Sequence, residues 1–174
     1  MLNSKPNNKN YHQGNYIPIN KDKVIRLNNE GGLYYRSSWE HKIMYWLDMK
    51  SEIAKWGCEC LQIPYQQTHF DNGDTRIKNH VYNVDFYYEM RINGELRQIV
   101  AEVKPMKEYK MVIALSENKL EVPERGTKKL KNFEYDLKAA YKNKQKWETM
   151  IGWCEKKGYD FIIITEENLK MFTI

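Results

Sequence analysis

Three charged residues interrupt apolar segments of the chain and could act together on a phosphate group. Asp85 lies within one such segment, and Glu102 and Lys104 flank Val103 in another. Carboxylates hold hard divalent cations, and an ammonium stabilises negative charge on a phosphodiester. These residue types therefore predict metal-assisted phosphodiester hydrolysis, if the fold brings them together.

The dipeptide Asn93-Gly94 sets the spacing between these charges. It joins two strand-like runs, 81–92 and 95–104, and it accepts the positive φ angles of a type I′ turn. A two-residue loop fixes the register of the hairpin. That register places Asp85 opposite Glu102.

Glu102 and Lys104 are two residues apart on one strand and therefore project from the same face. Two opposed carboxylates repel each other unless a cation lies between them. Mg²⁺ is the expected cation, with Mn²⁺ as a substitute. The residues alone leave an alternative open, in which Lys104 forms an ordinary salt bridge with Asp85 or Glu102 on a solvated sheet face.

The flanking sequence predicts the elements that carry this hairpin. Apolar periodicity and capping residues indicate helices, and runs of branched and aromatic residues indicate strands. In chain order we predict an N-terminal arm or loop over 1–32, a helix over 38–50, a strand over 53–65, a polar loop or excursion of the hairpin over 66–79, the hairpin, an irregular stretch over 106–126, a helix over 128–157, a strand over 159–164 and a last helical turn or two.

The long helix over 128–157 connects the hairpin to the last strand. A strand reached through a crossover helix lies parallel to its neighbour in the same sheet. The sequence therefore predicts an α/β fold, with a mixed sheet flanked by helices, in a single domain over 33–174.

Composition is that of an ordinary globular protein. The chain has 174 residues, of which 41% are hydrophobic and 29% charged, which excludes the disordered and collagen-like classes. No apolar run has the length of a membrane span, and the first residues lack the apolar core of a signal peptide, so we expect a protein that is not secreted and has no membrane partner. The three cysteines lack the spacing of zinc sites and are expected to be reduced thiols.

The positive charge is concentrated on one segment. The net charge is +5, and residues 127–157 alone hold nine lysines against four acidic residues. Such a segment is typical of a surface that meets phosphate, although a lysine-rich helix is often only a solvated face.

Asn83-Val84-Asp85 followed by Glu102-Val103-Lys104 resembles the PD-(D/E)xK signature of restriction-endonuclease-like nucleases, with Val84 at the position of the proline. The wider sequence, from about residue 31 to residue 169, resembles the head completion nucleases of T-even-like bacteriophages and the endonuclease subunit of Tn7-like transposases. The matching segments are Tyr35-Arg36-Ser37-Ser38-Trp39-Glu40, Ile63-Pro64-Tyr65, Val84-Asp85-Phe86, Glu102-Val103-Lys104-Pro105, Lys146-Trp147 and Phe161-Ile162-Ile163-Ile164-Thr165-Glu166.

The resemblance implies that the mixed sheet flanked by helices is a restriction-endonuclease-like fold, and it implies a set of site residues. Asp85, Glu102, the Val103 carbonyl and Glu40 would bind the metal, and Lys104 would complete the catalytic set. Glu40 also follows Ser37 at the spacing of a capping box, so a purely structural role is its alternative.

Three further residues are candidates for DNA binding. Arg36 precedes the first helix and could hold a phosphate or pair with a surface acid. Gln145 and Lys146 lie on the basic helix, where a solvated face is the alternative.

The function implied by the resemblance is a Mg²⁺-dependent DNA endonuclease that acts in phage head completion after DNA packaging. Its expected partners are DNA and the head or portal proteins, with a homodimer as an expected assembly. The expected location is the host cytoplasm during virion assembly, or the virion itself. Two alternatives remain open, a non-catalytic head completion protein that binds DNA ends or the portal, and a transposase or recombination endonuclease.

Overall fold

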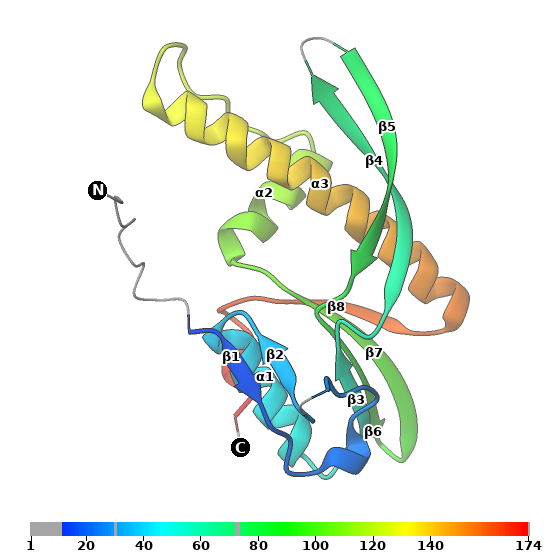
Figure 1. Cartoon of the computed structure of the whole chain (residues 1–174). Helices are drawn as coiled ribbons and strands as arrows, with labels where there is room; N and C mark the ends of the chain where they lie inside the picture. Colours follow the sequence, from blue (N-terminus) through cyan, green and yellow to red (C-terminus); the bar gives the residue numbers. More distant parts are fainter. Residues whose placement is uncertain (1–11, 30, 72–73, 174) are drawn as a thin grey trace.

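A four-stranded mixed sheet forms the centre of the protein. The computed structural model describes residues 12–29, 31–71 and 74–173 (Figure 1). Within these, the central sheet has the strand order β3-β6-β7-β8, with β3 and β7 antiparallel to β6, and β8 parallel to β7. The bounds of these strands are Ile53–Cys58 for β3, Phe86–Ile92 for β6, Glu95–Val103 for β7 and Asp160–Ile164 for β8. The predicted mixed sheet is confirmed.

The β6–β7 hairpin has the register that its turn predicts. Ile92 pairs with Glu95, and the ladder continues to Phe86 opposite Ala101. Asn93 and Gly94 have φ angles of 51° and 87°, as a type I′ turn requires.

Two helices cover opposite faces of the sheet. Helix α1 (Ser38–Met49) begins at Ser37, whose side chain accepts a hydrogen bond from the Glu40 amide. Helix α3 (Lys128–Lys157) is one continuous helix that ends at Gly158, where φ is 71°. It is the crossover between β7 and β8, so the predicted layers of helix, sheet and helix are confirmed.

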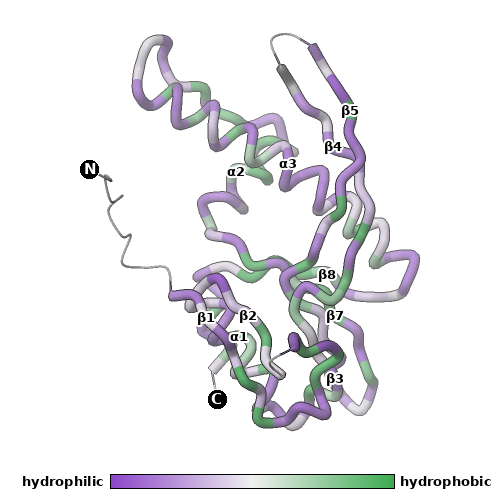
Figure 2. Tube along the Cα trace, in the orientation of Figure 1, coloured by the Kyte–Doolittle hydropathy of each residue, from purple (hydrophilic) through white to green (hydrophobic). Residues whose placement is uncertain are grey.

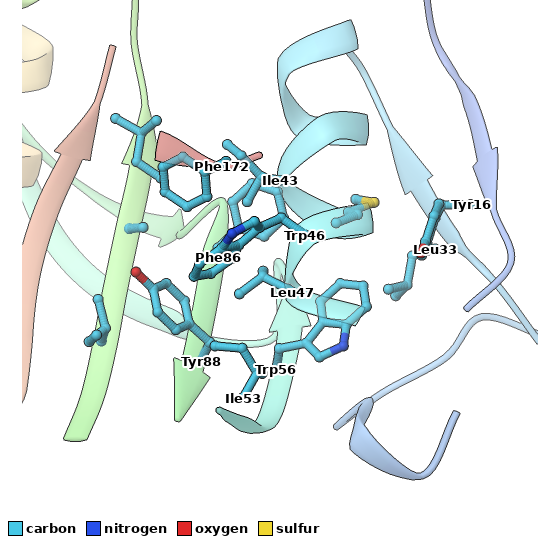
Figure 3. Packing of buried hydrophobic residues seen from close by; sticks show 14 residues of the cluster. Tyr16, Leu33, Ile43, Trp46, Leu47, Ile53, Trp56, Phe86, Tyr88 and Phe172 are labelled. Carbon is cyan, nitrogen blue, oxygen red and sulfur yellow. The ribbon is translucent and has the colours of Figure 1, made fainter. Parts of the chain in front are cut away.

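The α1 face holds the larger part of the core, shown in Figure 3. Trp56 and Phe86 from the sheet are fully buried against Leu47 of α1. Each buried side chain of this size contributes about 1.5–3 kcal/mol. The α3 face is a separate cluster, in which Val100 and Met150 are fully buried.

Residues 66–71 and 74–79 belong to a segment predicted as a polar loop or an excursion of the hairpin. They form strands, so the prediction of a loop is wrong. Strands β4 (Gln62–Asp71) and β5 (Asp74–Asn83) pair along their whole length and form a two-stranded ribbon that projects from the body of the molecule (Figure 1). Figure 2 shows that the outer part of this ribbon is mostly hydrophilic. Exposed strands need no apolar alternation, so the pattern from which strands are predicted is missing here.

The strands predicted over 53–65 and 81–92 are each divided in two. The first divides after Cys58, where Glu59 takes a positive φ of 46°. The second divides at Val84 and Asp85, between β5 and β6. These two breaks separate the β4–β5 ribbon from the central sheet.

The stretch predicted to be irregular contains helix α2 (Met106–Ser116), which begins directly after Pro105. Only Val112 of this helix is fully buried, so its apolar periodicity is weak. Helix α2 packs against α3 and contributes to a third apolar cluster with Ala140 and Trp147.

The N-terminal segment is partly structured. Residues 1–11 of the predicted arm lie outside the described residues, but β1 (Gly14–Tyr16) pairs with β2 (Leu33–Tyr35), and a 3-10 helix, η1, spans Lys21–Lys23. The Asp48 carboxylate at the end of α1 is fully buried and accepts hydrogen bonds from the Tyr16 hydroxyl and the Ile19 and Asn20 amides. A second 3-10 helix, η2 (Leu169–Met171), follows β8. In the described part of the chain, no helix is both long and apolar enough to cross a membrane.

Candidate active site

Asp85 lies where the chain leaves the ribbon and enters the central sheet. Its side chain reaches across to β7, where Oδ2 accepts a hydrogen bond of 2.8 Å from the Val103 amide. Because β6 begins only at Phe86, this carboxylate takes the place of a backbone partner for Val103. The break between β5 and β6 thus aims Asp85 at the end of β7.

Glu102 and Lys104 project from the same face of the sheet, as their spacing predicts. Lys104 Nζ lies 2.9 Å from Glu102 Oε1 and donates a hydrogen bond of 3.3 Å to the Val103 carbonyl. Glu102 is only 1% exposed. The structure therefore brings together Asp85, Glu102 and Lys104 at the end of β7. The salt bridge that the sequence left open does form, but in a largely buried place and not on a solvated sheet face.

In this cluster, the carboxylates of Asp85 and Glu102 lie around one ammonium group, that of Lys104. Burial raises the pKa of Asp85 to about 7, and the charge of Glu102 adds to the rise, while Lys104 opposes it. Burial would lower the pKa of Lys104, but the charges of Glu102 and Asp85 raise it above its ordinary value. The site therefore holds more negative charge than Lys104 alone balances.

Tyr82 is a member of the site that the sequence prediction missed. Its side chain is fully buried, and burial followed by the charge of Glu102 raises its pKa. Neither the Tyr82 hydroxyl nor Glu102 Oε2 has a hydrogen-bond partner of normal geometry. Tyr82 lies on β5, in the segment read as a plain strand, so no sequence signal singled it out.

Of the two candidates on α3, only Lys146 approaches the carboxylates. Its ammonium lies 4.5 Å from the centre of the Tyr82 ring, and burial lowers its pKa although Glu102 acts in the opposite direction. Gln145 instead binds Thr68 of the ribbon. It accepts a hydrogen bond from the Thr68 amide and donates one of 2.8 Å to the Thr68 hydroxyl. The predicted roles of both residues in DNA binding stay predictions.

Glu40 forms the helix cap that was its alternative role. Its carboxylate accepts hydrogen bonds from the Arg36 amide, at 2.7 Å, and from the Ser37 hydroxyl, at 3.1 Å. It nevertheless lines the same cavity, of about 610 Å³, as Val103 and Lys104. Its predicted role in metal binding stays a prediction.

Arg36 pairs with a surface acid, the alternative that the sequence left open. Its guanidinium forms a two-pronged ion pair with Glu59, one arm of which is a hydrogen bond of 3.2 Å from Nη2 to Oε2. Both side chains are exposed, so a phosphate could compete for Arg36 at little cost.

The donor set at the end of β7 fits a hard cation. Across residues 12–29, 31–71 and 74–173, no three histidine, cysteine or acidic side chains gather as ligands of one ion. Two carboxylates and the Val103 carbonyl remain, and Mg²⁺ is commonly held by one or two carboxylates together with water and phosphate oxygens. The unpartnered Glu102 Oε2 leaves a buried oxygen available for such an ion.

The chain is similar to known nucleases over most of its length. Residues 50–166 match the family described as TnsA-like endonuclease N terminal. The chain is also similar to the head completion nuclease of Enterobacteria phage T4, with 28% identity over 159 residues, which cover 91% of this chain and 94% of that protein. The matched family segment contains Asp85, Glu102, Lys104 and the whole central sheet.

Proposed function

The chain belongs to the TnsA-like endonuclease N-terminal family, and we propose that it is a Mg²⁺-dependent DNA endonuclease that acts in phage head completion. The observation that carries the proposal is the buried pair of carboxylates, Asp85 and Glu102, with Lys104 beside them. A protein that only binds DNA gains nothing from opposed carboxylates beside a phosphate, because they repel it. This favours cutting over the non-catalytic alternative.

Asp85, Glu102 and the Val103 carbonyl would hold the ion in this proposal. When bound, Mg²⁺ supplies Lewis-acid stabilisation of the negative charge that develops on the phosphate and makes the attacking water more acidic. The Val103 amide fixes the Asp85 carboxylate through its 2.8 Å hydrogen bond. Burial of Glu102 fixes the second carboxylate, so the two ligands are positioned before the substrate arrives.

Lys104 carries the positive charge that faces the phosphate. Its ammonium lies 2.9 Å from Glu102 Oε1 and donates a hydrogen bond to the Val103 carbonyl, so these contacts hold the positive charge beside the groups that would bind the ion. Lys146, above the Tyr82 ring, adds a second positive charge on the α3 side. Both charges act in a partly buried site, where they are screened less than on the surface.

The first test is nicking of a supercoiled plasmid by the purified protein. We expect relaxation of the plasmid in Mg²⁺ or Mn²⁺ and none in excess EDTA. Lys104→Ala is expected to slow cutting by at least about a hundredfold, because it removes the positive charge nearest to the phosphate. Lys156→Ala, at the far end of α3, is the matched control and should cut at the normal rate.

Cutting that continues in EDTA would contradict the metal requirement. Cutting by Lys104→Ala at the normal rate would contradict the assignment of the active site to the end of β7, whatever the protein's metal requirement. Both measurements use gel-resolved nicked and linear plasmid, so single-strand and double-strand cutting are separated in the same experiment.

Glu40→Gln separates the two roles of Glu40. Glutamine can keep the capping box, so the free energy of unfolding should change by less than about 0.5 kcal/mol. If the Glu40 carboxylate helps to hold the ion, the Mg²⁺ concentration for half-maximal nicking should rise by about tenfold. The measurement is a Mg²⁺ titration of the nicking rate together with a denaturant melt.

Ser37→Ala is the control for capping, because Ser37 accepts the hydrogen bond from the Glu40 amide. It should lower the free energy of unfolding by about 1 kcal/mol and leave the Mg²⁺ titration unchanged. A Mg²⁺ titration of Glu40→Gln that coincides with that of the unmodified protein would assign Glu40 to the cap alone.

A further inference from the structure

A groove runs between α2 and α3 and opens at the candidate active site. It has a volume of about 880 Å³, and Lys104 and Lys146 line its inner end. The cavity that holds Glu40 meets Lys104 and Pro105 from the other side, so two hollows adjoin at Lys104. A strand cut at Lys104 could therefore extend in both directions along the protein surface.

Lysine side chains dominate the charge of this groove. Three acidic residues, Glu108, Glu121 and Asp136, also line it. Asp136 is paired with Lys107 at 2.5 Å, and Glu108 accepts a hydrogen bond from Asn143. The lysines of the groove are Lys104, Lys107, Lys110, Lys119, Lys142 and Lys146.

Two of these lysines remain available for a ligand. Within the described part of the chain, Lys110 on α2 and Lys142 on α3 are not in any ion pair, and both side chains are exposed. Helices α2 and α3 form the two walls of the groove, so the two ammonium groups come from opposite walls. This arrangement suits the phosphates of a strand that lies between them.

Apolar side chains also line the groove. Met111 from α2, Leu120 from the connection and Phe133 from α3 are each half-buried along it. A duplex keeps its bases stacked inside and presents mainly phosphates and sugars to a basic surface. Unpaired bases expose flat apolar faces, and proteins bind single strands by combining a positive groove with apolar and aromatic contacts.

We infer that the α2–α3 groove binds an unpaired DNA strand next to the phosphate that is cut. The inference rests on the proposed nuclease function and narrows its substrate class to DNA with a single-stranded segment beside the cut, such as a tail, a flap or a gap. Lys110 and Lys142 contact the strand's phosphates, and the apolar side chains contact its bases.

The test measures binding without cutting. A fluorescent single strand of about 20 nucleotides, longer than most single-strand binding sites, and a duplex of equal length are titrated with protein in Ca²⁺ without Mg²⁺. The groove variant is Lys110→Gln with Lys142→Gln. The matched control is Lys131→Gln with Lys138→Gln, two exposed lysines of α3 that do not line the groove.

We expect the groove variant to bind the single strand about tenfold more weakly, and the duplex less than about threefold more weakly. The slope of log affinity against log salt for the single strand should fall by about 1.4, because two phosphate contacts are lost. The control variant should match the unmodified protein on both probes. An equal loss in both variants, or an equal loss on both probes, would overturn the inference.

The binding assay is read separately from the proposed function, because it contains no Mg²⁺ and measures no cutting, so its result stands whether or not the protein cuts DNA. A fluorescent poly-glutamate peptide serves as a further probe. If it binds through Lys110 and Lys142 and the single strand does not, the groove is a protein-binding surface and the inference is wrong.

Discussion

Glu102→Gln is expected to abolish DNA cutting while the protein stays folded. Loss of one carboxylate ligand removes several kcal/mol of stabilisation at the phosphate, which corresponds to about a thousandfold in rate. The measurement is the plasmid-nicking rate at saturating Mg²⁺. Glu102→Gln is the sharpest substitution here, because glutamine has nearly the same shape and Glu102 is almost completely buried.

The stability of this variant should change in the opposite sense to its activity. The charge of Glu102 raises the pKa of Asp85, so the two carboxylates repel each other, and removal of one charge relieves that repulsion in the metal-free protein. The melting temperature in EDTA is expected to be unchanged or higher. A variant that melts much lower would show that Glu102 is a structural partner of Lys104 rather than half of a metal site.

The same variant tests the biological role. In the phage genome that we propose carries this gene, Glu102→Gln should give full heads that do not become infectious particles. Infectious particles in normal yield would mean that binding, and not cutting, is the contribution to head completion. The Lys131→Gln and Lys138→Gln variant is the control, because it leaves both the site and the groove intact.

Asp48→Ala is expected to give the largest loss of stability of any polar substitution proposed here, about 3–5 kcal/mol. The Asp48 carboxylate is fully buried and accepts three hydrogen bonds, from the Tyr16 hydroxyl and two backbone amides at 2.7 to 2.9 Å. Alanine leaves all three donors without a partner. The midpoint of thermal unfolding should fall by about 10 °C. Tyr16→Phe removes only one of these bonds and should cost about 1 kcal/mol.

The contribution of Asp48 depends on pH in a defined direction. Burial alone would raise its pKa, but the hydrogen bonds from Tyr16, Ile19 and Asn20 lower it below the ordinary value of 3.8. The stabilisation is therefore present above that value and is lost as the pH falls through the lower pKa of the folded state. The difference in unfolding free energy between the unmodified protein and Asp48→Ala should be constant from about pH 7 to 5 and shrink below about pH 4. If this difference in unfolding free energy grew toward acid pH, the predicted contribution of the ionised Asp48 carboxylate would be wrong.

The central hairpin could be predicted from the sequence because one local rule determines it. Asn93-Gly94 fixes a turn type, the turn fixes the register, and strand parity places Glu102 and Lys104 on one face. The β4–β5 ribbon could not be predicted in this way, because the outer parts of its strands bury no face and therefore lack alternation. The strand break at Asp85 was missed for a different reason, since the run 81–92 has apolar residues on both sides of it.

The parts of the site that depend on tertiary packing were also beyond the sequence. Tyr82 reaches Glu102 only because the ribbon folds back over α3, and a single tyrosine in a strand carries no signal of that contact. Helix α2 is short and buries one residue completely, so it was not predicted from the sequence. The groove beside Lys104, which α2 lines on one side, could therefore not be predicted either. For Glu40 the sequence carried a signal but could not decide its role, because the same spacing from Ser37 fits both a helix cap and a metal ligand.

The place where the ribbon leaves the sheet separates two parts of the molecule that can change independently. The break at Val84 and Asp85 lies between the paired strands of the ribbon and the hairpin that carries the carboxylates. Residues added in pairs to β4 and β5 would lengthen the ribbon without shifting the β6–β7 register by a single position. The ribbon is thus a place where related proteins can differ in length, and where a sequence can be inserted, while the chemistry of the site is preserved.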